Sequence, residues 1–184
     1  MERTLKLNLS ISQTQFNMKN LKVKSISSKN LKDIPAINEK HDCGQCLWYQ
    51  KEKQSLEAKK QWFVKMEKKY GSCGKILYLK DKAIGFAQFG PKSIFPRLKS
   101  KNANVWYITC LAIKEEYRGK GFGKVLLKSV LSDLKKRKVK KVQICGLISG
   151  DIGNFSAGFW QAYEKLGFKE IAKTKKYKVG EKLL

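Results

Sequence analysis

Long apolar segments are missing from this sequence. No run approaches the roughly 18 apolar residues that a membrane-spanning helix needs, and the first residues, MERTLKLNLSISQTQFN, lack the continuous apolar core of a secretory signal peptide. We therefore expect a protein without a membrane anchor. With 184 residues, the chain has a length that suits one domain with its own core. We assign that domain to residues 18–184, and a leader or an extra strand to residues 1–17.

Acidic residues and arginines are both scarce in a chain that is strongly basic. The 40 Lys and Arg residues outnumber the 15 Asp and Glu residues, which gives a net charge of +25. Such a field attracts polyanions. Yet only Arg3, Arg97, Arg118 and Arg137 are arginines, and the lysines are spread over the whole length. Because arginine is the usual reader of phosphates and bases, the composition favours a solvated lysine surface and makes nucleic-acid binding unlikely.

Histidine and cysteine are too few for a standard metal site. The chain has one histidine and five cysteines, and an odd cysteine count without a secretory leader indicates a reducing compartment, so we expect the cytoplasm. Cys43-x-x-Cys46 is half of a zinc site, which His41 and Cys73 would have to complete. Since no second Cys-x-x-Cys or histidine pair exists, zinc and a redox pair remain alternatives to simple loop packing. We predict no metal.

Hydrophobic periodicity predicts a mixed α/β (α+β) fold. The second expected helix, which begins at the cap Ser55 and ends at Gly71, should bury Leu56, Phe63, Met66 and Tyr70. In chain order the expected elements are a strand (21–27), a short helix from Ser28 that buries Leu31, Ile34 and Ile37, the helix 56–70, a hairpin (75–79 and 83–89), a central strand (105–113), a helix (125–134), a strand (140–148), a helix (156–166) and a last strand (169–179). The order β-α-α-β-β-β-α-β-α-β predicts one mixed sheet flanked by helices.

Three glycines at alternate positions stand between the central strand and the next helix, in EEYRGKGFGKVLL (115–127). A glycine-rich turn from a strand into a helix brings backbone N–H groups and the positive end of the helix dipole to one point, where an anion binds. The stretch does not fit a Walker A loop, because Val125 follows Gly123-Lys124 where Ser or Thr is needed. It does not fit the Rossmann fingerprint either, because the third glycine position falls on Lys124 or Leu126.

The remaining pattern, R-x-x-G-x-G from Arg118 to Gly123, resembles the acyl-CoA loop of the GNAT superfamily of N-acyltransferases. AYEKLGF (162–168) resembles the second signature of that family. The resemblance implies a GNAT-like, mostly antiparallel twisted sheet and an N-acetyltransferase that moves an acetyl group from acetyl-CoA to a primary amine by direct attack in a ternary complex. For the loop alone, a tight turn without a ligand is the alternative.

The resemblance also assigns residues that bind the cofactor. The glycines and cations of the loop would hold the pyrophosphate of coenzyme A, and the central strand would offer its backbone to the pantetheine arm. A serine where the family often has asparagine would hydrogen-bond the cofactor. These predicted residues are Leu111, Ala112, Ile113, Arg118, Gly119, Lys120, Gly121, Phe122, Gly123, Lys124 and Ser156.

Tyr163 occupies the position of the family's usual general acid. A phenol with a pKa of about 10 stays neutral at rest and can protonate a departing thiolate. The alternative is an aromatic core residue on a helix. The resemblance also places the loop that carries Trp48 and Tyr49 beside the acceptor pocket, where both side chains would contact substrate. We name no general base.

The sequence does not identify the acceptor, which is the amine of a small molecule or of a protein. The positive field favours an amine carried by an acidic molecule and disfavours a polycationic acceptor. Two other functions stay open: a family member that binds coenzyme A without turnover, and a basic nucleic-acid-binding protein. We expect a monomer or a homodimer.

Overall fold

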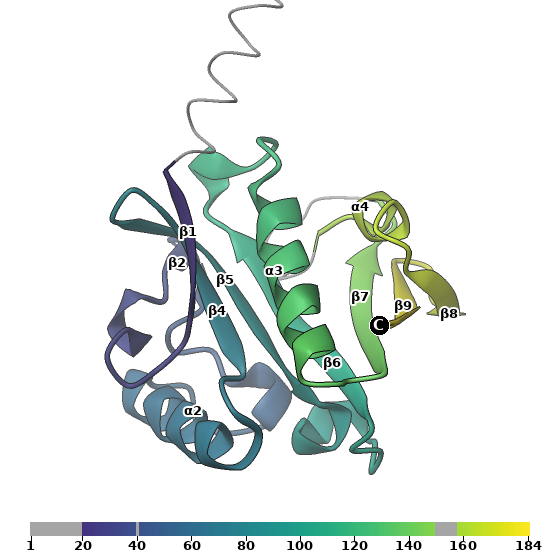
Figure 1. Cartoon of the computed structure of the whole chain (residues 1–184), viewed down its shortest axis with the longest axis horizontal. Coiled ribbons are helices and arrows are strands. Elements are labelled where there is room, and N and C mark those ends of the chain that lie inside the picture. Colours follow the sequence, from purple (N-terminus) through teal and green to yellow (C-terminus); the bar gives the residue numbers. More distant parts are fainter. Residues whose placement is uncertain (1–19, 40, 150–157) are drawn as a thin grey trace, which may run out of the picture.

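A mixed sheet of seven strands forms the centre of the computed structural model, which describes residues 20–39, 41–149 and 158–184. The strand order is β1-β4-β5-β6-β7-β9-β8, and only β6 and β7 run parallel (Figure 1). The strands are β1 (Leu21–Ser25), β4 (Gly74–Leu79), β5 (Lys82–Pro91), β6 (Val105–Ile113), β7 (Lys141–Leu147), β8 (Lys169–Lys173) and β9 (Tyr177–Leu183). The predicted fold class is confirmed, whereas the predicted leader lies outside the described residues.

Helices cover both faces of the sheet. α2 (Leu56–Tyr70) packs on one face, and α3 (Phe122–Lys136) and α4 (Trp160–Glu164) pack on the other (Figure 1). The central strand β6 is buried from Val105 to Ala112, as predicted for a strand with apolar neighbours on both faces. None of the helices described here is long and apolar enough to cross a membrane.

α2 forms where its capping residues predict it. The Ser55 hydroxyl accepts a hydrogen bond from the Ala58 N–H at 3.1 Å, which satisfies a donor of the first turn. Gly71 ends the helix with a φ of 74°, a conformation that glycine adopts without strain. The buried face differs from the prediction, because Leu56 is half exposed. The residues of α2 that are buried are Lys59, Trp62, Phe63 and Met66.

The predicted first helix is wrong. Leu31–Asp33 forms a single 3-10 turn (η1), and the chain continues as β2 (Ala36–Asn38), which pairs with the short β3 (His41–Asp42). Pro35 explains the difference, because a residue before proline is disfavoured in the helical conformation, and Ile34 has a ψ of 117°. The apolar residues of the pattern are buried all the same. The periodicity therefore indicated burial rather than a helix.

The C-terminal elements also differ from the prediction. α4 has five residues, Trp160–Glu164, and the segment before Gly158 lies outside the described residues. The predicted last strand is a hairpin of β8 and β9, because Thr174 forms a turn: its hydroxyl accepts hydrogen bonds from the N–H groups of Lys176 (3.3 Å) and Tyr177 (3.0 Å). β9 pairs along β7, and β8 is an edge strand whose residues are all exposed.

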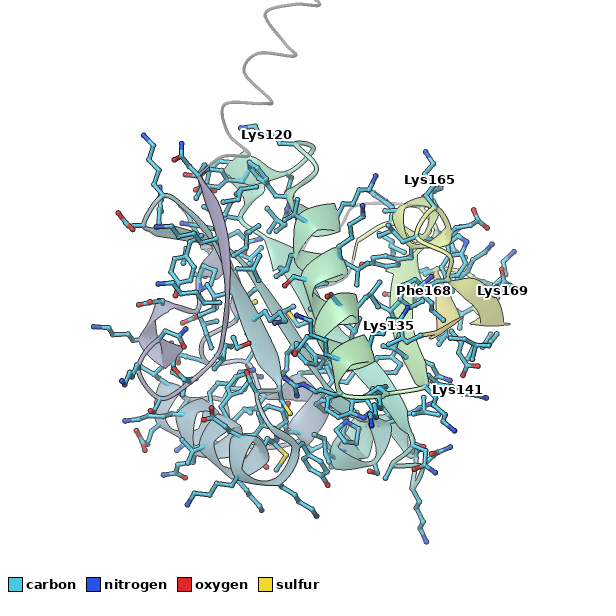
Figure 2. The ribbon with its side chains drawn as sticks, in the orientation of Figure 1. Lys120, Lys135, Lys141, Lys165, Phe168 and Lys169 are labelled. Atoms are coloured by element: carbon cyan, nitrogen blue, oxygen red, sulfur yellow. The ribbon has the colours of Figure 1, made fainter. Side chains whose placement is uncertain are left out.

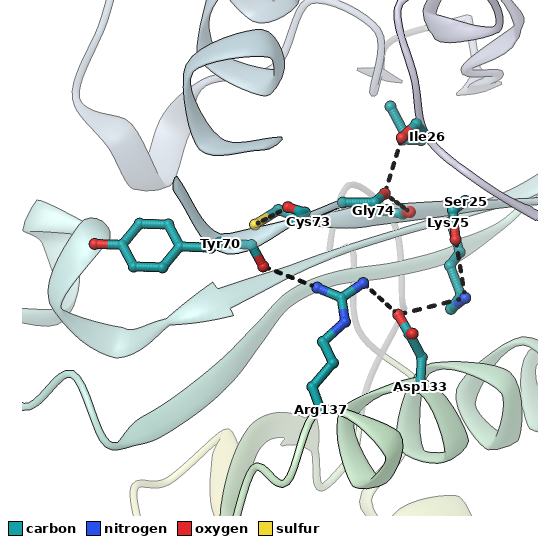
Figure 3. A network of polar contacts seen from close by, with 10 residues as sticks. Ser25, Ile26, Tyr70, Cys73, Gly74, Lys75, Asp133 and Arg137 are labelled. Atoms are coloured by element: carbon teal, nitrogen blue, oxygen red, sulfur yellow. Dashed lines mark hydrogen bonds and ion pairs between the residues drawn. The ribbon is translucent and has the colours of Figure 1, made fainter. Parts of the chain in front are cut away.

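Arg137 joins α3 to the neighbouring layer. Its guanidinium donates to the Asp133 carboxylate at 2.6 Å and to the Tyr70 carbonyl oxygen at 3.1 Å, and the Lys75 ammonium lies 3.5 Å from the same carboxylate (Figure 3). A single ion pair at the surface adds little stability, but these three contacts link α3, the end of α2 and β4. The network holds the C-terminal end of α3 against the end of α2 and the start of β4.

The lysines labelled in Figure 2 lie on several different elements. Lys120 lies at the glycine loop, Lys135 on α3, Lys141 at the start of β7, and Lys165 and Lys169 at the end of α4 and the start of β8 (Figure 2). The described residues form five ion pairs. With 40 basic and 15 acidic residues in the whole chain, most lysines have no carboxylate partner. The surface field is therefore positive over a wide area rather than at one arm.

Candidate active site

The parallel ladder between β6 and β7 is incomplete. Its last pair is Ile108 with Ile144, whereas β6 continues alongside β5 and β7 continues alongside β9. The two strands diverge toward the N-terminal end of α3 (Figure 1). At the end of β6, the edge of Leu111–Ile113 that faces β7 has no strand partner in the described part of the chain, so an extended ligand can pair with it. This stretch holds the predicted pantetheine-binding residues Leu111, Ala112 and Ile113.

The glycine loop has the backbone conformation that its sequence requires. A 3-10 turn, η5 (Glu115–Tyr117), leads into it, and Gly119 and Gly121 have φ values of 75° and 82°, where a residue with a Cβ is strained. Gly121 is the N-cap of α3, and no side chain caps this helix end. The first N–H groups of α3 are therefore available to an anion. A Cβ atom at Gly119 or Gly121 would meet no described atom within 4 Å, which leaves room for a ligand.

The side chains around the loop differ in their contacts. The Arg118 Nε donates to the Ile113 carbonyl oxygen at 3.1 Å, which ties the loop to the end of β6. Lys120 donates to a carbonyl oxygen of η5 at 3.0 Å, and Lys124 is exposed in the first turn of α3. Phe122 is 3% exposed and belongs to the core. Since the Phe122 side chain is in the core, only the backbone of this predicted cofactor residue could contact a ligand.

Tyr163 is buried in α4, on the α3 face of the sheet. Its phenol oxygen accepts a hydrogen bond from the Gly158 N–H at 2.5 Å, which leaves the phenol proton to be donated. Burial raises the pKa of Tyr163, and the Gly158 hydrogen bond opposes that rise. Cys110 of β6 and Cys145 of β7 also raise this pKa. Ser156, the predicted cofactor residue, lies outside the described residues.

Gly146 of β7 makes room for Tyr163, and the sequence analysis missed it. A Cβ atom at Gly146 would lie 2.9 Å from the Tyr163 Cδ2 and 3.0 Å from the Trp160 Cα, closer than carbon atoms pack. The missing side chain lets α4 approach the sheet. A glycine inside a strand often marks a close approach of this kind, and that signal was present in the sequence.

Tyr107 and Cys145 meet where β6 and β7 part. Burial is the main cause of the raised pKa of each, and each of the two side chains also acts on the pKa of the other. Tyr49 reaches the same place from the loop before α2: its ring centroid lies 6.3 Å from that of Tyr107, and burial raises its pKa as well. The sequence predicted a role for Tyr49 but not for Tyr107 or Cys145, because only the register of the sheet brings those two together.

Trp48 and Tyr49 share a 3-10 turn, η2 (Trp48–Gln50), but lie in different environments. Tyr49 is mostly buried on the α2 face of the sheet, whereas Trp48 is 50% exposed. η2 packs against η4 (Pro96–Leu98), where the Arg97 guanidinium lies 4.2 Å from the centre of the Trp48 ring. Both predicted acceptor-side residues are thus on the face opposite α3.

The Cys-x-x-Cys loop is packed against the sheet. The Cys43 Sγ lies 3.9 Å from the Cys110 Sγ of β6, and the Cys46 carbonyl oxygen accepts a hydrogen bond at 2.6 Å from the buried Lys59 ammonium. All five cysteines are free thiols. Among the residues that the structure describes, no three His, Cys, Asp or Glu side chains are grouped to hold a metal ion.

Comparison with known proteins gives one consistent result. The model of the acetyltransferase (GNAT) family matches residues 36–168. The fold is similar to an N-acetyltransferase from Staphylococcus aureus Mu50 (16% identity, 89% of this chain, 98% of that chain, TM-score 0.62). It is also similar to the PaiA N-acetyltransferase of Thermoplasma acidophilum in complex with coenzyme A (18% identity, 89% of this chain, 99% of that chain, TM-score 0.55). A third similar structure is a ribosomal-protein-alanine N-acetyltransferase of Brucella melitensis (17% identity, 89% of this chain, 99% of that chain, TM-score 0.61). No curated protein sequence matches the chain.

The buried tyrosines predict that the folded chain loses stability at alkaline pH. Tyr49, Tyr107 and Tyr163 have raised pKa values in the folded chain, whereas a tyrosine in the unfolded chain ionises at about pH 10. Their contribution to stability is complete below that pH and is lost above it, because the unfolded chain then releases protons that the folded chain retains. We expect the free energy of unfolding to fall with rising pH above about pH 10, as measured by urea denaturation.

Phenolate absorbance provides the direct check on the same protein. The three phenols should ionise only as circular dichroism reports unfolding, and Tyr107→Phe should reduce that coupled step. Ionisation of all seven tyrosines near the ordinary pKa of about 10, with native circular dichroism, would contradict this assignment.

Proposed function

The chain belongs to the acetyltransferase (GNAT) family, and we propose that it moves the acetyl group of acetyl-CoA to a primary amine by direct attack in a ternary complex. The observation that supports this proposal most is the position of the glycine loop at the open end of the gap between β6 and β7. A donor with phosphates at one end and a thioester arm at the other matches both features at once.

We assign the pyrophosphate of acetyl-CoA to the N-terminal end of α3. The N–H groups that follow Gly121 and the cations of Arg118, Lys120 and Lys124 provide the complementary charge. The pantetheine arm then pairs along Leu111–Ile113 as an added strand would. This path carries the thioester toward the point where the two strands part.

The reaction forms an amide bond and breaks the thioester bond. The neutral amine attacks the carbonyl carbon, and the sulfur departs with the bonding electrons. The nitrogen loses one proton to solvent as the amide forms, and Tyr163 donates its phenol proton to the thiolate. The Gly158 N–H, already bonded to the phenol oxygen, stabilises the phenolate until solvent returns a proton to it. The net charge of +25 assists by lowering the pKa of the bound amine.

For the acceptor we propose an amine of a protein or of a small molecule. The Brucella relative is named for an alanine of a ribosomal protein, which supports a protein amine as one class. The free thiols suit a reducing compartment, so we propose a cytoplasmic enzyme. The oligomeric state, monomer or homodimer, stays a prediction.

Calorimetry and a turnover assay test this function against its alternatives. Acetyl-CoA should bind at moderate salt, and acetyl-CoA with an amine should release the thiol of coenzyme A. Binding without thiol release would indicate a family member without turnover. Binding of a short duplex with a steep salt dependence and no affinity for acetyl-CoA would indicate the nucleic-acid-binding alternative.

Gly121→Val should weaken acetyl-CoA binding. Apart from the neighbouring residues, the new Cβ atom meets no described atom within 4 Å, so the side chain projects into the space assigned to the ligand rather than into the core. We expect the dissociation constant, measured by calorimetry, to rise by about tenfold or more, equivalent to at least about 1.4 kcal/mol. Backbone strain at φ 82° should cost about 1–2 kcal/mol of stability.

Gly123→Ala is the matched control. Its Cβ atom would have only the Ile113 side chain nearby, at 3.8 Å, and alanine is favoured over glycine inside a helix by about 0.5–1 kcal/mol. This variant should keep its affinity and gain stability. Wild-type affinity in a folded Gly121→Val variant would reject the assignment of the loop.

Tyr163→Phe should lower kcat and leave acetyl-CoA affinity unchanged. The ring keeps its packing against Phe168, but the only proton that the phenol can give is lost. The expected loss is roughly ten- to ten-thousand-fold in kcat. Because the Gly158 N–H also loses its acceptor, the free energy of unfolding should fall by about 1–3 kcal/mol.

Tyr107→Phe is the control that separates the effect of Tyr163→Phe on kcat from its effect on stability. It removes a buried hydroxyl from the same gap but not the proposed acid, so it should reduce stability with much less effect on kcat. Equal kcat values in wild type and a folded Tyr163→Phe enzyme would exclude Tyr163 as the acid without excluding acetyl transfer.

A further inference from the structure

Arg97 and Trp48 form a contact that the proposed reaction does not use. The Arg97 guanidinium stacks on the Trp48 ring at 4.2 Å, and its Nε donates a hydrogen bond to the Trp48 carbonyl oxygen. Both residues are exposed. The stacking and the hydrogen bond fix the plane of the guanidinium on two packed turns, η2 and η4. The planar guanidinium of Arg97, called the fork below, is therefore held in place before any ligand arrives.

Within the described part of the chain, the terminal nitrogens of the Arg97 guanidinium have no anionic partner. No carboxylate among the described residues lies within ion-pair distance of Arg97. Arg137, by contrast, is paired with Asp133. A planar guanidinium with free terminal N–H groups matches a carboxylate through two parallel hydrogen bonds, and a ring stacked beneath it keeps it from turning away.

A series of aromatic contacts connects this fork to the proposed site. The Trp48 and Tyr49 ring centroids are 4.8 Å apart, and those of Tyr49 and Tyr107 are 6.3 Å apart. Tyr107 lies next to Ile108, the last residue of β6 that pairs with β7, so its ring marks the place where the two strands part. The guanidinium is consequently at most roughly 15 Å from the Tyr107 ring, a length that about four to five extended residues span.

We propose that Arg97, held by Trp48, binds a carboxylate of the acceptor, and that the acceptor is a peptide with an acidic side chain within about five residues of its reacting amine. This inference rests on the proposed function, since it assumes that the amine enters at Tyr107. The net charge of +25 attracts any acidic molecule from a distance. Arg97, by contrast, would favour only those acidic peptides whose carboxylate lies at the right distance from the reacting amine.

Two peptides test the subsite. Both begin with a free alanine amine, contain no lysine, and differ only by Glu or Gln at the third position. The KM of each is measured in turnover, and its dissociation constant is measured by calorimetry with the enzyme saturated with coenzyme A. We expect the wild-type enzyme to bind the Glu peptide about tenfold more tightly, equivalent to about 1.4 kcal/mol.

Three variants distinguish a specific contact with the Arg97 guanidinium from attraction by the overall positive charge of the protein. Arg97→Gln should abolish the preference for Glu, and Arg97→Lys, which keeps the charge but not the planar fork, should retain at most about twofold. Lys101→Gln removes a charge from the same loop at an exposed residue and should leave the preference intact. Unchanged acetyl-CoA affinity shows that each variant is folded.

The outcomes distinguish this inference from the proposed function. Equal affinity of wild type for the two peptides, binding of neither peptide, or the same preference in wild type and Arg97→Gln would overturn the subsite. A preference in the dissociation constant that depends on Arg97, without any acetylation, would uphold the subsite and reject turnover. Acetylation of both peptides without a preference would uphold the transfer reaction and reject the subsite.

Discussion

The parting of β6 and β7 after Ile108 and Ile144 is the constraint on which the rest of the site depends. If two parallel strands paired along their whole length, they would leave no edge for a donor to occupy. Here each strand keeps its ladder on the outer side, β6 with β5 and β7 with β9, so these two ladders hold the strands on either side of the gap. A register shift between Gln88 and Phe89 places an extra residue in β6 at this level, and Cys110 then points to the α2 face.

The two ends of this gap differ in their electrostatics. At its open end, the uncapped start of α3 and the cations beside it suit a multiply charged anion. At its closed end, Tyr107, Tyr163 and Cys145 are neutral groups whose pKa values burial raises. A ligand with phosphates at one end and an uncharged thioester at the other fits this order. The same neutral environment keeps Tyr163, the proposed general acid, protonated until a thiolate forms beside it.

Much of this arrangement was predictable, because local chemistry determines it. The cap at Ser55 acts through a local side-chain hydrogen bond, and the stop at Gly71 and the glycines before α3 act through their own backbone conformations. The prediction of the first helix was wrong because Pro35 prevents the helical conformation that the spacing of the apolar residues indicated. The prediction of one last strand was wrong because Thr174 forms a turn that divides it into β8 and β9.

The partners within the site were less predictable. Tyr107 meets Cys145, and Gly146 admits Tyr163, through the pairing of strands far apart in sequence. No local pattern encodes that register. The stacking of Arg97 on its indole partner likewise depends on two loops that only the folded chain brings together.

Amide hydrogen exchange with and without acetyl-CoA tests the central claim most directly, because it locates the donor without assuming turnover. The account predicts slower exchange at Leu111–Ile113 and in the first turn of α3, from Phe122 to Val125, with little change in α2. Protection that is absent from both segments, or that appears only on the α2 face, would contradict the placement of the donor in the gap between β6 and β7.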